Sequence, residues 1–229
     1  MKTIGIVGGT SWHSSIDYYR LINEFVNQRL GGNEAAQIIL YSVNYGEIVT
    51  LTQQGDWDRI AAIICNAAWK IDRAGADCIL LGANTMHKIA ERVERSVSVP
   101  LLHIATETGR VIQRKGLQKV GLLGTKYTME LGFYAEKLSE LGIETVLPGD
   151  EDRIFVNDVI YHELGKGLLK KESKERYLTI IDNLQRKGAE GIILGCTEIP
   201  MLIKQADTPI PVFDTTHIHA AAAVEFALG

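Results

Sequence analysis

The sequence predicts an α/β fold of two similar, pseudo-symmetric domains, each a parallel sheet flanked by helices. One observation is an internal repeat: AGADCILLGANT (74–85) aligns with KGAEGIILGCTE (187–198), so that Ala83 falls on Cys196, 113 residues later. A second is the alternation of short apolar runs with helical patterns, which is typical of parallel sheets covered by helices. A third is the length, because 229 residues suffice for two domains of about 100 residues each.

The expected strands are short runs rich in Ile, Leu and Val that end in Gly or another small residue, whereas the expected helices are longer and amphipathic. Strands are expected near residues 3–8, 37–43, 77–82, 119–123, 143–147 and 190–195. Helices are expected near residues 16–30, 57–74, 105–115, 128–141 and 172–187. Each copy of the repeat therefore contains a helix end, a Gly-Ala-acid turn, a buried strand and a small-residue loop that opens the next helix.

Two further pairs of segments extend the repeat. KTIGIVGGTS (2–11) resembles QKVGLLGTKY (118–127), and PLLHIATET (100–108) resembles PVFDTTHIH (211–219). Repeats of this length are domains that each bury a core.

By repeat position, the last strand and helix belong with the first half of the chain. We therefore expect a first domain of residues 1–103 plus 209–229 and a second of residues 104–208. The active site is expected in the cleft between them.

Composition excludes several classes of protein. The formal net charge is −4 and no Lys/Arg cluster occurs, so a nucleic-acid partner is not expected. No apolar run approaches the roughly 18 residues of a membrane span, and we expect a cytoplasmic protein without a membrane partner. The three cysteines lack zinc or disulfide spacing, and Cys65 and Cys78 lie within a helical and a strand pattern as packing residues. No metal site is expected.

Cys196 has a different context from the other two cysteines. It follows a strand and Gly195, and it precedes Thr197 and Glu198 at an expected helix start. Backbone N–H groups and the helix dipole at such a position stabilise an anion, which predicts a lowered thiol pKa and a reactive thiolate. In a doubly wound sheet this carboxyl edge is also where ligands bind.

Three further loops share this strand-to-helix pattern: GGTS (8–11), NTMH (84–87) and GTKYT (124–128). Their hydroxyl and amide groups, with few fixed charges, suit a carboxylate ligand. GGTS lacks the glycine spacing of dinucleotide sites and the lysine of a phosphate loop, and no lysine has a pyridoxal phosphate context, so no cofactor is expected. The candidate ligand-binding residues are Thr10, Ser11, Asn84, Thr85, Thr125, Thr128 and Thr197.

Several blocks, kept in order over nearly the whole chain, carry a family resemblance. They are IGIVGGTSWHSSIDYYR, GANTMHK, LLGTKYTME, IYHELGKG, EGIILGCTEIP and PVFDTTHIHAAAAVEF. Together they resemble the aspartate/glutamate racemase family. The resemblance implies two α/β domains with the active site between them, no cofactor, a small amino-acid or dicarboxylate substrate, and a homodimer.

The resemblance also implies a mechanism in which the α-proton is removed from one face of the substrate and returned to the other. Two acid/base groups are needed, because one group cannot reach both faces. One of the family's two positions maps onto Cys196 and the other, a cysteine or threonine in the family, onto Ala83, whose methyl group cannot carry a proton.

Three explanations for Ala83 stay open. The chain is an impaired two-base racemase, natural or engineered; or water, Thr85 or His87 replaces the first base; or the chemistry uses one base, as in a single-cysteine decarboxylase or isomerase of dicarboxylates. A non-catalytic carboxylate-binding paralogue is a further alternative.

The resemblance assigns supporting roles as well. Asn84, Thr85 and Thr197 match motif residues that bind the substrate carboxylate and stabilise the developing enediolate. Gln53 and Glu198 are further candidate substrate-binding residues. Gln53 is expected in a mobile loop over the cleft or in a solvated loop, and Glu198 either pairs with a substrate ammonium or favours a helix N-terminus. In some family members a lysine near IYHELGKG binds the distal carboxylate of the substrate. Here Gly165 stands in that place and Lys166 is displaced by one position, so the choice between aspartate and glutamate as substrate stays open.

Overall fold

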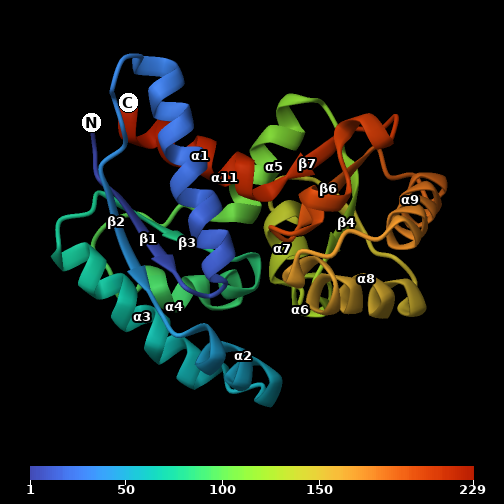
Figure 1. Cartoon of the computed structure of the whole chain (residues 1–229), viewed down its shortest axis with the longest axis horizontal. Coiled ribbons are helices and arrows are strands. Elements are labelled where there is room, and N and C mark those ends of the chain that lie inside the picture. The colour runs from blue at the N-terminus through green and yellow to red at the C-terminus, as the bar shows by residue number, and fades with distance from the viewer. The chain divides into compact units, whose positions relative to one another are not determined.

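The computed structural model describes all 229 residues, which form two compact units (Figure 1). The first unit comprises Met1–Ile104 and His219–Gly229, and the second comprises Ala105–Ile218. Each unit contains its own all-parallel sheet, with strand order β2-β1-β3 in the first and β5-β4-β6-β7 in the second. The predicted fold class is confirmed.

The sheet of the first unit is short and its central strand is fully buried. Its strands are β1 (Ile4–Gly8), β2 (Ile38–Ser42) and β3 (Cys78–Leu81). Ile6 lies opposite both Leu40 and Leu80, and a single bridge between Ile79 and Leu101 continues the sheet beyond β3. Strands buried on both faces form continuous apolar runs, and this explains why the sequence pattern located them well.

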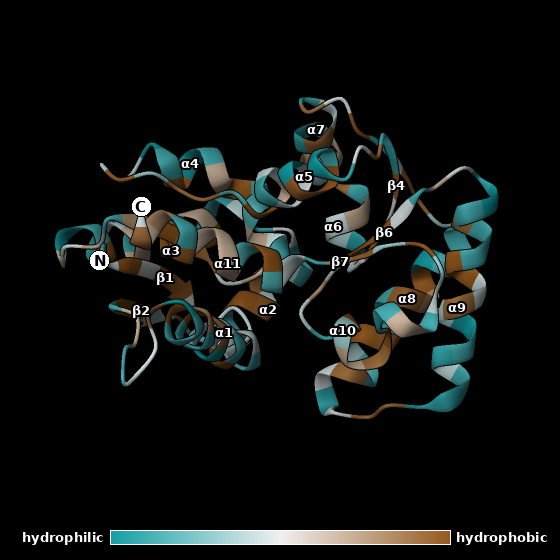
Figure 2. Ribbon diagram, turned by 90° about the horizontal axis from the view of Figure 1, so that it is seen from above, coloured by the Kyte–Doolittle hydropathy of each residue, from teal (hydrophilic) through white to brown (hydrophobic).

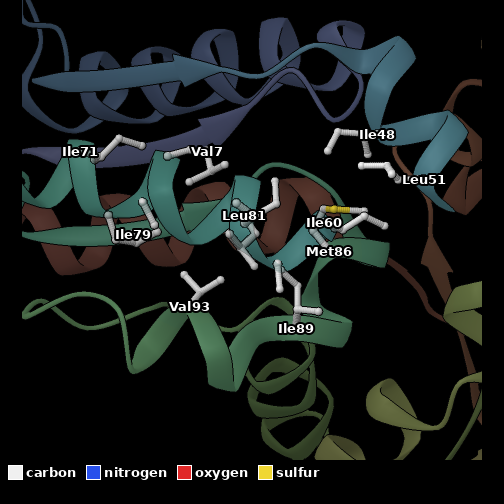
Figure 3. Close-up of a cluster of buried hydrophobic side chains, with 14 of the residues drawn as sticks. Val7, Ile48, Leu51, Ile60, Ile71, Ile79, Leu81, Met86, Ile89 and Val93 are labelled. Carbon is white, nitrogen blue, oxygen red and sulfur yellow. The ribbon is translucent and has the colours of Figure 1, made fainter. Parts of the chain in front are cut away.

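Helices cover both faces of this sheet. They are α1 (Trp12–Leu30), α2 (Tyr45–Gln54), α3 (Trp57–Arg73), the 3-10 helix η1 (Asn84–Ile89), α4 (Ala90–Glu94) and the later part of α11 (Thr215–Leu228). Val7 and Leu81 pack with residues of α2, α3 and η1 in one core (Figure 3). Ile4 and Ile6, on the opposite face of β1, pack with α1 and α11 in a second core.

Helix α2 was not anticipated. Asn44 begins it, because its side chain accepts a hydrogen bond from the Gly46 N–H, and Gly55 ends it in the left-handed conformation. Ile48 and Leu51, three residues apart, are buried in the core of the first unit. The helix has only ten residues and many of them are polar, so its apolar pattern is too short to be recognised in the sequence.

The second unit contains a four-stranded sheet and its own helices. Its strands are β4 (Lys119–Gly124), β5 (Glu144–Val146), β6 (Gly191–Gly195) and β7 (Val212–Asp214). Its helices are α5 (Ile104–Arg114), α6 (Lys126–Glu130), α7 (Phe133–Ser139), α8 (Asp150–His162), η2 (Leu164–Lys166), α9 (Lys171–Arg186), α10 (Ile199–Leu202) and η3 (Gln205–Asp207). Gly121 allows α9 to pack closely on β4, because a Cβ there would lie 2.9 Å from Leu184 Cδ1.

The structure differs from the sequence interpretation at two places. The helix expected over 128–141 is divided into α6 and α7, because Gly132 between them has φ +76°. The strand after residue 209, expected in the first domain, belongs to the second unit, because β7 pairs with β6. The chain therefore returns to the first unit within α11, at His219.

The internal repeat is visible in equivalent hydrogen bonds within each unit. The Asp77 carboxylate accepts from the Thr3 N–H in the first unit, and the Glu190 carboxylate accepts from the Gln118 and Lys119 N–H groups in the second. In both copies the acid follows a Gly-Ala pair and holds the beginning of the neighbouring strand. The acidic residue of the Gly-Ala-acid turn thus has a defined structural role.

The hydropathy of the residues agrees with an arrangement in which helices cover a sheet inside each unit. Helices such as α3 and α9 alternate between hydrophilic and hydrophobic residues along their length, whereas strand β6 is hydrophobic (Figure 2). Such alternation is expected of helices with one face on a sheet. None of the helices combines the length and the apolar character needed to cross a membrane.

Candidate active site

The candidate residues lie where neighbouring strands of each sheet end. In the first unit, β1 leads into Gly9–Ser11 and its neighbour β3 leads into Ala83–Thr85; we call these the first-unit loops. In the second unit, β4 leads into Thr125–Thr128 and its neighbour β6 leads into Cys196–Glu198, the second-unit loops. Because parallel strands end at the same edge, each sheet brings its two loops together.

Two serines at the start of α1 hold the first-unit loops. The Ser14 hydroxyl donates to the Gly82 carbonyl oxygen at 2.6 Å, and the Gly9 N–H donates to Ser15 Oγ at 2.9 Å. Both serines are buried. Sequence reasoning missed them; the signal was the pair of small hydroxyl residues in SWHSS, just inside a helix.

The predicted residues Thr10 and Ser11 have different environments. Ser11 is the N-cap of α1, since its side chain accepts from the Ser14 N–H at 3.5 Å. Thr10 is 7% exposed, and its buried hydroxyl has no hydrogen-bond partner within the protein. Such a buried hydroxyl is costly unless it is satisfied by something outside the chain, which makes Thr10 the stronger ligand-binding candidate of the two.

The loop after β3 is anchored by the residues that follow it. Ala83 is the N-cap of η1 in an extended conformation and is partly buried, as is Thr85, whereas Asn84 is buried. Met86 and Ile89 of the same 3-10 helix insert into the apolar core (Figure 3). Packing of the helix that follows residue 83 thus fixes the position of this residue.

His87 is buried next to this loop, and both of its ring nitrogens are engaged. Nε2 accepts a hydrogen bond from the Ile104 N–H at 3.2 Å, and Nδ1 lies 3.1 Å from the Ala83 carbonyl oxygen, to which it donates. Burial, with His103 and His219 nearby, holds the pKa of His87 well below its ordinary value. Neither ring nitrogen of His87 is therefore available to act as a base.

In the second unit, Thr125 and Thr128 pack against the strand ends. Thr125 is the N-cap of α6, its hydroxyl accepting from the Thr128 N–H at 3.3 Å. Thr128 is 1% exposed, and a Cβ on Gly124 or Gly195 would lie 3.2–3.3 Å from its Cγ2 atom. Thr128 therefore packs against these two glycines, and its contact with a ligand stays a prediction.

Cys196, Thr197 and Glu198 form one hydrogen-bonded group. The Cys196 thiol donates to Glu198 Oε2 at 2.9 Å, and the Thr197 hydroxyl donates to the same oxygen at 2.7 Å. All three residues are partly buried. The predicted residues of this loop are thus brought together, with the carboxylate as the common acceptor.

The expected direction of the Cys196 pKa was wrong. Burial of the sulfur and then the negative charge and hydrogen bond of Glu198 raise the pKa of Cys196 well above its ordinary value, although the Glu198 and Thr197 backbone amides act in the opposite direction. The helix expected to stabilise the thiolate, α10, has only four residues. In this state Cys196 is a thiol hydrogen-bonded to a carboxylate. The inert Cys78, in contrast, is fully buried in β3, and burial raises its pKa to about 11.

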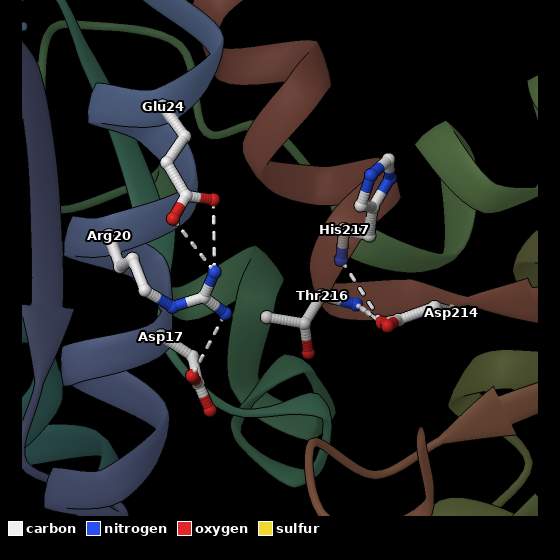
Figure 4. A network of polar contacts seen from close by, with 6 residues as sticks. All are labelled: Asp17, Arg20, Glu24, Asp214, Thr216 and His217. Atoms are coloured by element: carbon white, nitrogen blue, oxygen red, sulfur yellow. Dashed lines mark hydrogen bonds and ion pairs between the residues drawn. The ribbon is translucent and has the colours of Figure 1, made fainter. Parts of the chain in front are cut away.

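Neighbouring elements complete the second-unit loops. The Tyr177 hydroxyl of α9 donates to the Val156 carbonyl oxygen, and burial raises the pKa of Tyr177. The Thr215 hydroxyl, after β7, donates to the Leu194 carbonyl oxygen at 3.0 Å. Asp214 accepts from the Thr216 and His217 N–H groups at the start of α11 (Figure 4). Tyr177 was missed because its sequence context is that of a core aromatic residue.

Two predicted features lie elsewhere. Gln53 is exposed on α2 and not in a loop. Lys166 is exposed at the end of η2, and the preceding Gly165 is close to the backbone, because a Cβ there would lie 3.1 Å from the Ile160 carbonyl oxygen. The tight turn at Gly165 thus leaves little room for a side chain at the position where some family members carry the lysine. No group of three or more His, Cys, Asp or Glu side chains is arranged to hold a metal ion.

Two α/β units, each with its own parallel sheet, and a thiol–carboxylate pair after β6 define a class of two-domain α/β proteins. Within this class, a family model for Asp/Glu/Hydantoin racemases matches residues 7–223. The chain belongs to this family.

Similar proteins agree with this assignment. A candidate Asp/Glu racemase from Yersinia pestis is 48% identical over the full length of both chains, with a TM-score of 0.95. PH1733, an aspartate racemase homologue from Pyrococcus horikoshii, is 39% identical over the full length of both chains, with a TM-score of 0.89. The broad specificity amino-acid racemase RacX of Bacillus subtilis is 28% identical over 169 residues, covering 74% of this chain and 73% of RacX.

The buried histidines predict a specific pH dependence of stability. Burial lowers the pKa of His219 to about 4, and the surrounding groups are Tyr18, His87 and His103. The unfolded chain binds the proton near pH 6.5 while the folded chain does not, so the stabilisation is complete above pH 6.5 and is lost as the pH falls toward 4. The loss is about 1.4 kcal/mol per pH unit for each such histidine.

Urea unfolding between pH 7.5 and 4.5 measures this loss. His219→Gln, which keeps a donor for the Leu102 carbonyl oxygen, is expected to flatten the pH dependence; His162→Gln, on the exposed surface of α8, is the matched control. An unchanged slope in His219→Gln would contradict the assignment.

The thiol–carboxylate contact predicts that Glu198→Gln lowers the pKa of Cys196, because the substitution removes a negative charge beside the sulfur. The measurement is the pH dependence of Cys196 alkylation by iodoacetamide, followed by mass spectrometry of its peptide. Thr197→Val, which removes the other donor to Glu198 but no charge, is the control. A midpoint for Glu198→Gln equal to or above that of the unsubstituted protein would show that Glu198 does not hold the proton on sulfur.

Proposed function

We propose that the protein is a cofactor-independent, cytoplasmic enzyme that moves the α-proton of aspartate, glutamate or a related acidic amino acid. Cys196 is the acid/base group on one face of the substrate, and the opposite position is occupied by Ala83. The observation that carries the proposal is the Cys196–Glu198 hydrogen bond, in a chain of a racemase family.

The contact supports a defined sequence of proton transfers. The Cys196 proton passes to Glu198 Oε2, 2.9 Å away, which leaves a thiolate and a neutral carboxylic acid. The thiolate then takes the proton from the substrate Cα, and the electron pair of the C–H bond moves into the enediolate of the α-carboxylate. Hydroxyl and amide donors stabilise that charge, and Thr10, Asn84, Thr85 and Thr197 are the proposed donors.

Ala83 determines what happens next. A methyl group cannot deliver a proton, and His87 beside it has both ring nitrogens engaged. Reprotonation therefore comes from Cys196, on the face from which the proton left. The expected result is exchange of the α-hydrogen with solvent without inversion, while racemisation is slow and depends on water or on Thr85.

A second candidate function follows from the same observation. A single acid/base group that protonates one face of an enediolate suits decarboxylation or isomerisation of a dicarboxylate. The engaged ring nitrogens of His87 support this candidate, because they leave the first face without a histidine base. Release of carbon dioxide from a substituted malonate by the unaltered chain would favour it over the racemase function.

The test of the main proposal is Ala83→Cys, which introduces a second thiol on the opposite face. Racemisation of L- and D-aspartate and of L- and D-glutamate is expected to rise roughly 10²–10⁴-fold, the usual contribution of a positioned acid/base group. NMR in deuterated water, with chiral analysis of the product, separates exchange from inversion. Cys196→Ala is expected to abolish exchange in the unaltered chain.

The double variant Ala83→Cys/Cys196→Ala is the matched control, because it moves the single thiol to the other face. It is expected to exchange the enantiomer that the unaltered chain does not exchange. Equal rates in all four proteins would exclude both positions from the mechanism, and no exchange in any of them would exclude the catalytic function for these substrates.

We also propose that the protein is a homodimer, as the family resemblance implies, and that helix α1 contributes to the interface. Trp12, Ile16 and Tyr19 lie on one face of α1 and are 52%, 56% and 57% exposed. Arg20 of the same helix pairs with Asp17 and Glu24 (Figure 4). Three large exposed side chains on one helix face are typical of a contact surface.

Ile16→Glu tests the interface, since a buried unpaired carboxylate in it is costly and would shift the protein toward monomer. Light scattering coupled to size exclusion measures the mass at several concentrations. Ile154→Glu is the matched control, because Ile154 is also a helical isoleucine, 63% exposed on α8. A monomeric unaltered chain, or a dimer insensitive to Ile16→Glu, would contradict this assignment.

A further inference from the structure

Three buried histidines cluster in the first unit, outside the groups that the proposed proton transfer uses. The ring centroids of His87 and His103 are 4.7 Å apart, and those of His87 and His219 are 5.6 Å apart. His103 precedes Ile104, the last residue before the chain leaves the first unit, and His219 is the residue at which the chain returns. The cluster therefore connects the two places where the chain passes between the units, Ile104 and His219, with η1, the 3-10 helix that follows Ala83.

The hydrogen-bond partners of His87 define its tautomer. The Ile104 N–H is a donor, so Nε2 must be an unprotonated acceptor, and the Ala83 carbonyl oxygen is an acceptor, so Nδ1 must carry the proton. A neutral ring with the proton on Nδ1 satisfies both contacts at once. A charged ring would repel the Ile104 N–H.

His219 is fixed in the opposite way. Its Nε2 donates to the Leu102 carbonyl oxygen at 2.7 Å, so Nδ1 accepts from the Tyr18 hydroxyl at 2.7 Å. Residues 102 and 104 of the same segment are therefore held by two different imidazole rings. The segment between β3 and α5 has little sheet pairing of its own, a single bridge at Leu101, so these contacts define its course.

We propose that His87 is a positioning residue of the reaction, which fixes the direction of residue 83 by holding its carbonyl oxygen and by joining it to the Ile104 amide. Apolar packing alone does not require a histidine here, because Met86 and Ile89 already anchor η1 in the core. A buried imidazole is costly unless both nitrogens are satisfied, and here both bonds go to backbone groups whose direction they set. This inference deepens the proposed function and rests on it for its catalytic part.

The tautomer is tested independently of activity. Two-bond ¹H–¹⁵N correlation spectra of the unaltered protein are expected to show His87 neutral with the proton on Nδ1, and His219 neutral with the proton on Nε2. Hydrogen exchange of the Ile104 amide is expected to accelerate at least tenfold in His87→Leu. A His87 ring protonated on Nε2, or an Ile104 amide insensitive to His87→Leu, would overturn the proposal.

The catalytic part is tested in the Ala83→Cys background, where residue 83 carries a working group. His87→Asn keeps a donor near the position of Nδ1, whereas His87→Leu removes both hydrogen bonds. We expect kcat for racemisation to fall at least tenfold in His87→Leu with KM nearly unchanged, and to be largely retained in His87→Asn, while exchange on the Cys196 face changes less than threefold in both.

Equal losses of kcat in the two variants, or an equal loss of exchange on the Cys196 face, would indicate a general structural role and overturn the positioning role. If no variant exchanges substrate, the proposed function fails. The tautomer and the Ile104 amide then decide alone whether His87 holds residue 83.

Discussion

The close contact of neighbouring strand ends at glycine is the constraint on which the rest of the structure depends. A Cβ on Gly82 would lie 3.1 Å from the Val7 carbonyl oxygen, and a Cβ on Gly195 would lie 3.0 Å from the Leu123 carbonyl oxygen. A Cβ at either position would make a tight contact with the neighbouring strand, so glycine is favoured where these two parallel strands end side by side. The residue after each glycine, Ala83 in the first unit and Cys196 in the second, therefore lies at the equivalent position on the edge of its sheet.

The sequence predicted the strands and their loops well because their signals are local. A Gly-Ala-acid turn, an apolar run and a terminal glycine are contiguous, so the repeat located both copies. The end of the second unit could not be read in this way, because Val212–Asp214 belongs there only through its pairing with β6. Helix α2 was missed for a similar reason: Ile48 and Leu51 are its buried apolar residues, and their burial depends on packing against α3.

The sequence indicated the candidate residues of the site but not the electrostatics around them. A helix start next to Cys196 indicated a thiolate, whereas the short helix contributes little and the Glu198 side chain turns back onto the sulfur. The rotamer of a neighbouring carboxylate cannot be read from spacing. The same limit applies to His87, whose two backbone partners, at residues 83 and 104, converge only in the folded unit.

The two copies of the repeat have thus diverged in chemistry while keeping one geometry. In the second unit, the charged side chain of Glu198 acts directly on the side chain after the glycine, because it accepts the hydrogen bond of the Cys196 thiol. In the first unit, His87 acts on it only through the backbone carbonyl. On the proposed mechanism these arrangements control separate quantities. Glu198 sets how readily a proton leaves one face of the substrate, and residue 83 sets whether a proton returns to the other face. On the same mechanism, loss of the second function is expected to leave the first intact, so that alanine at 83 would permit exchange of the α-hydrogen without the inversion that defines a racemase.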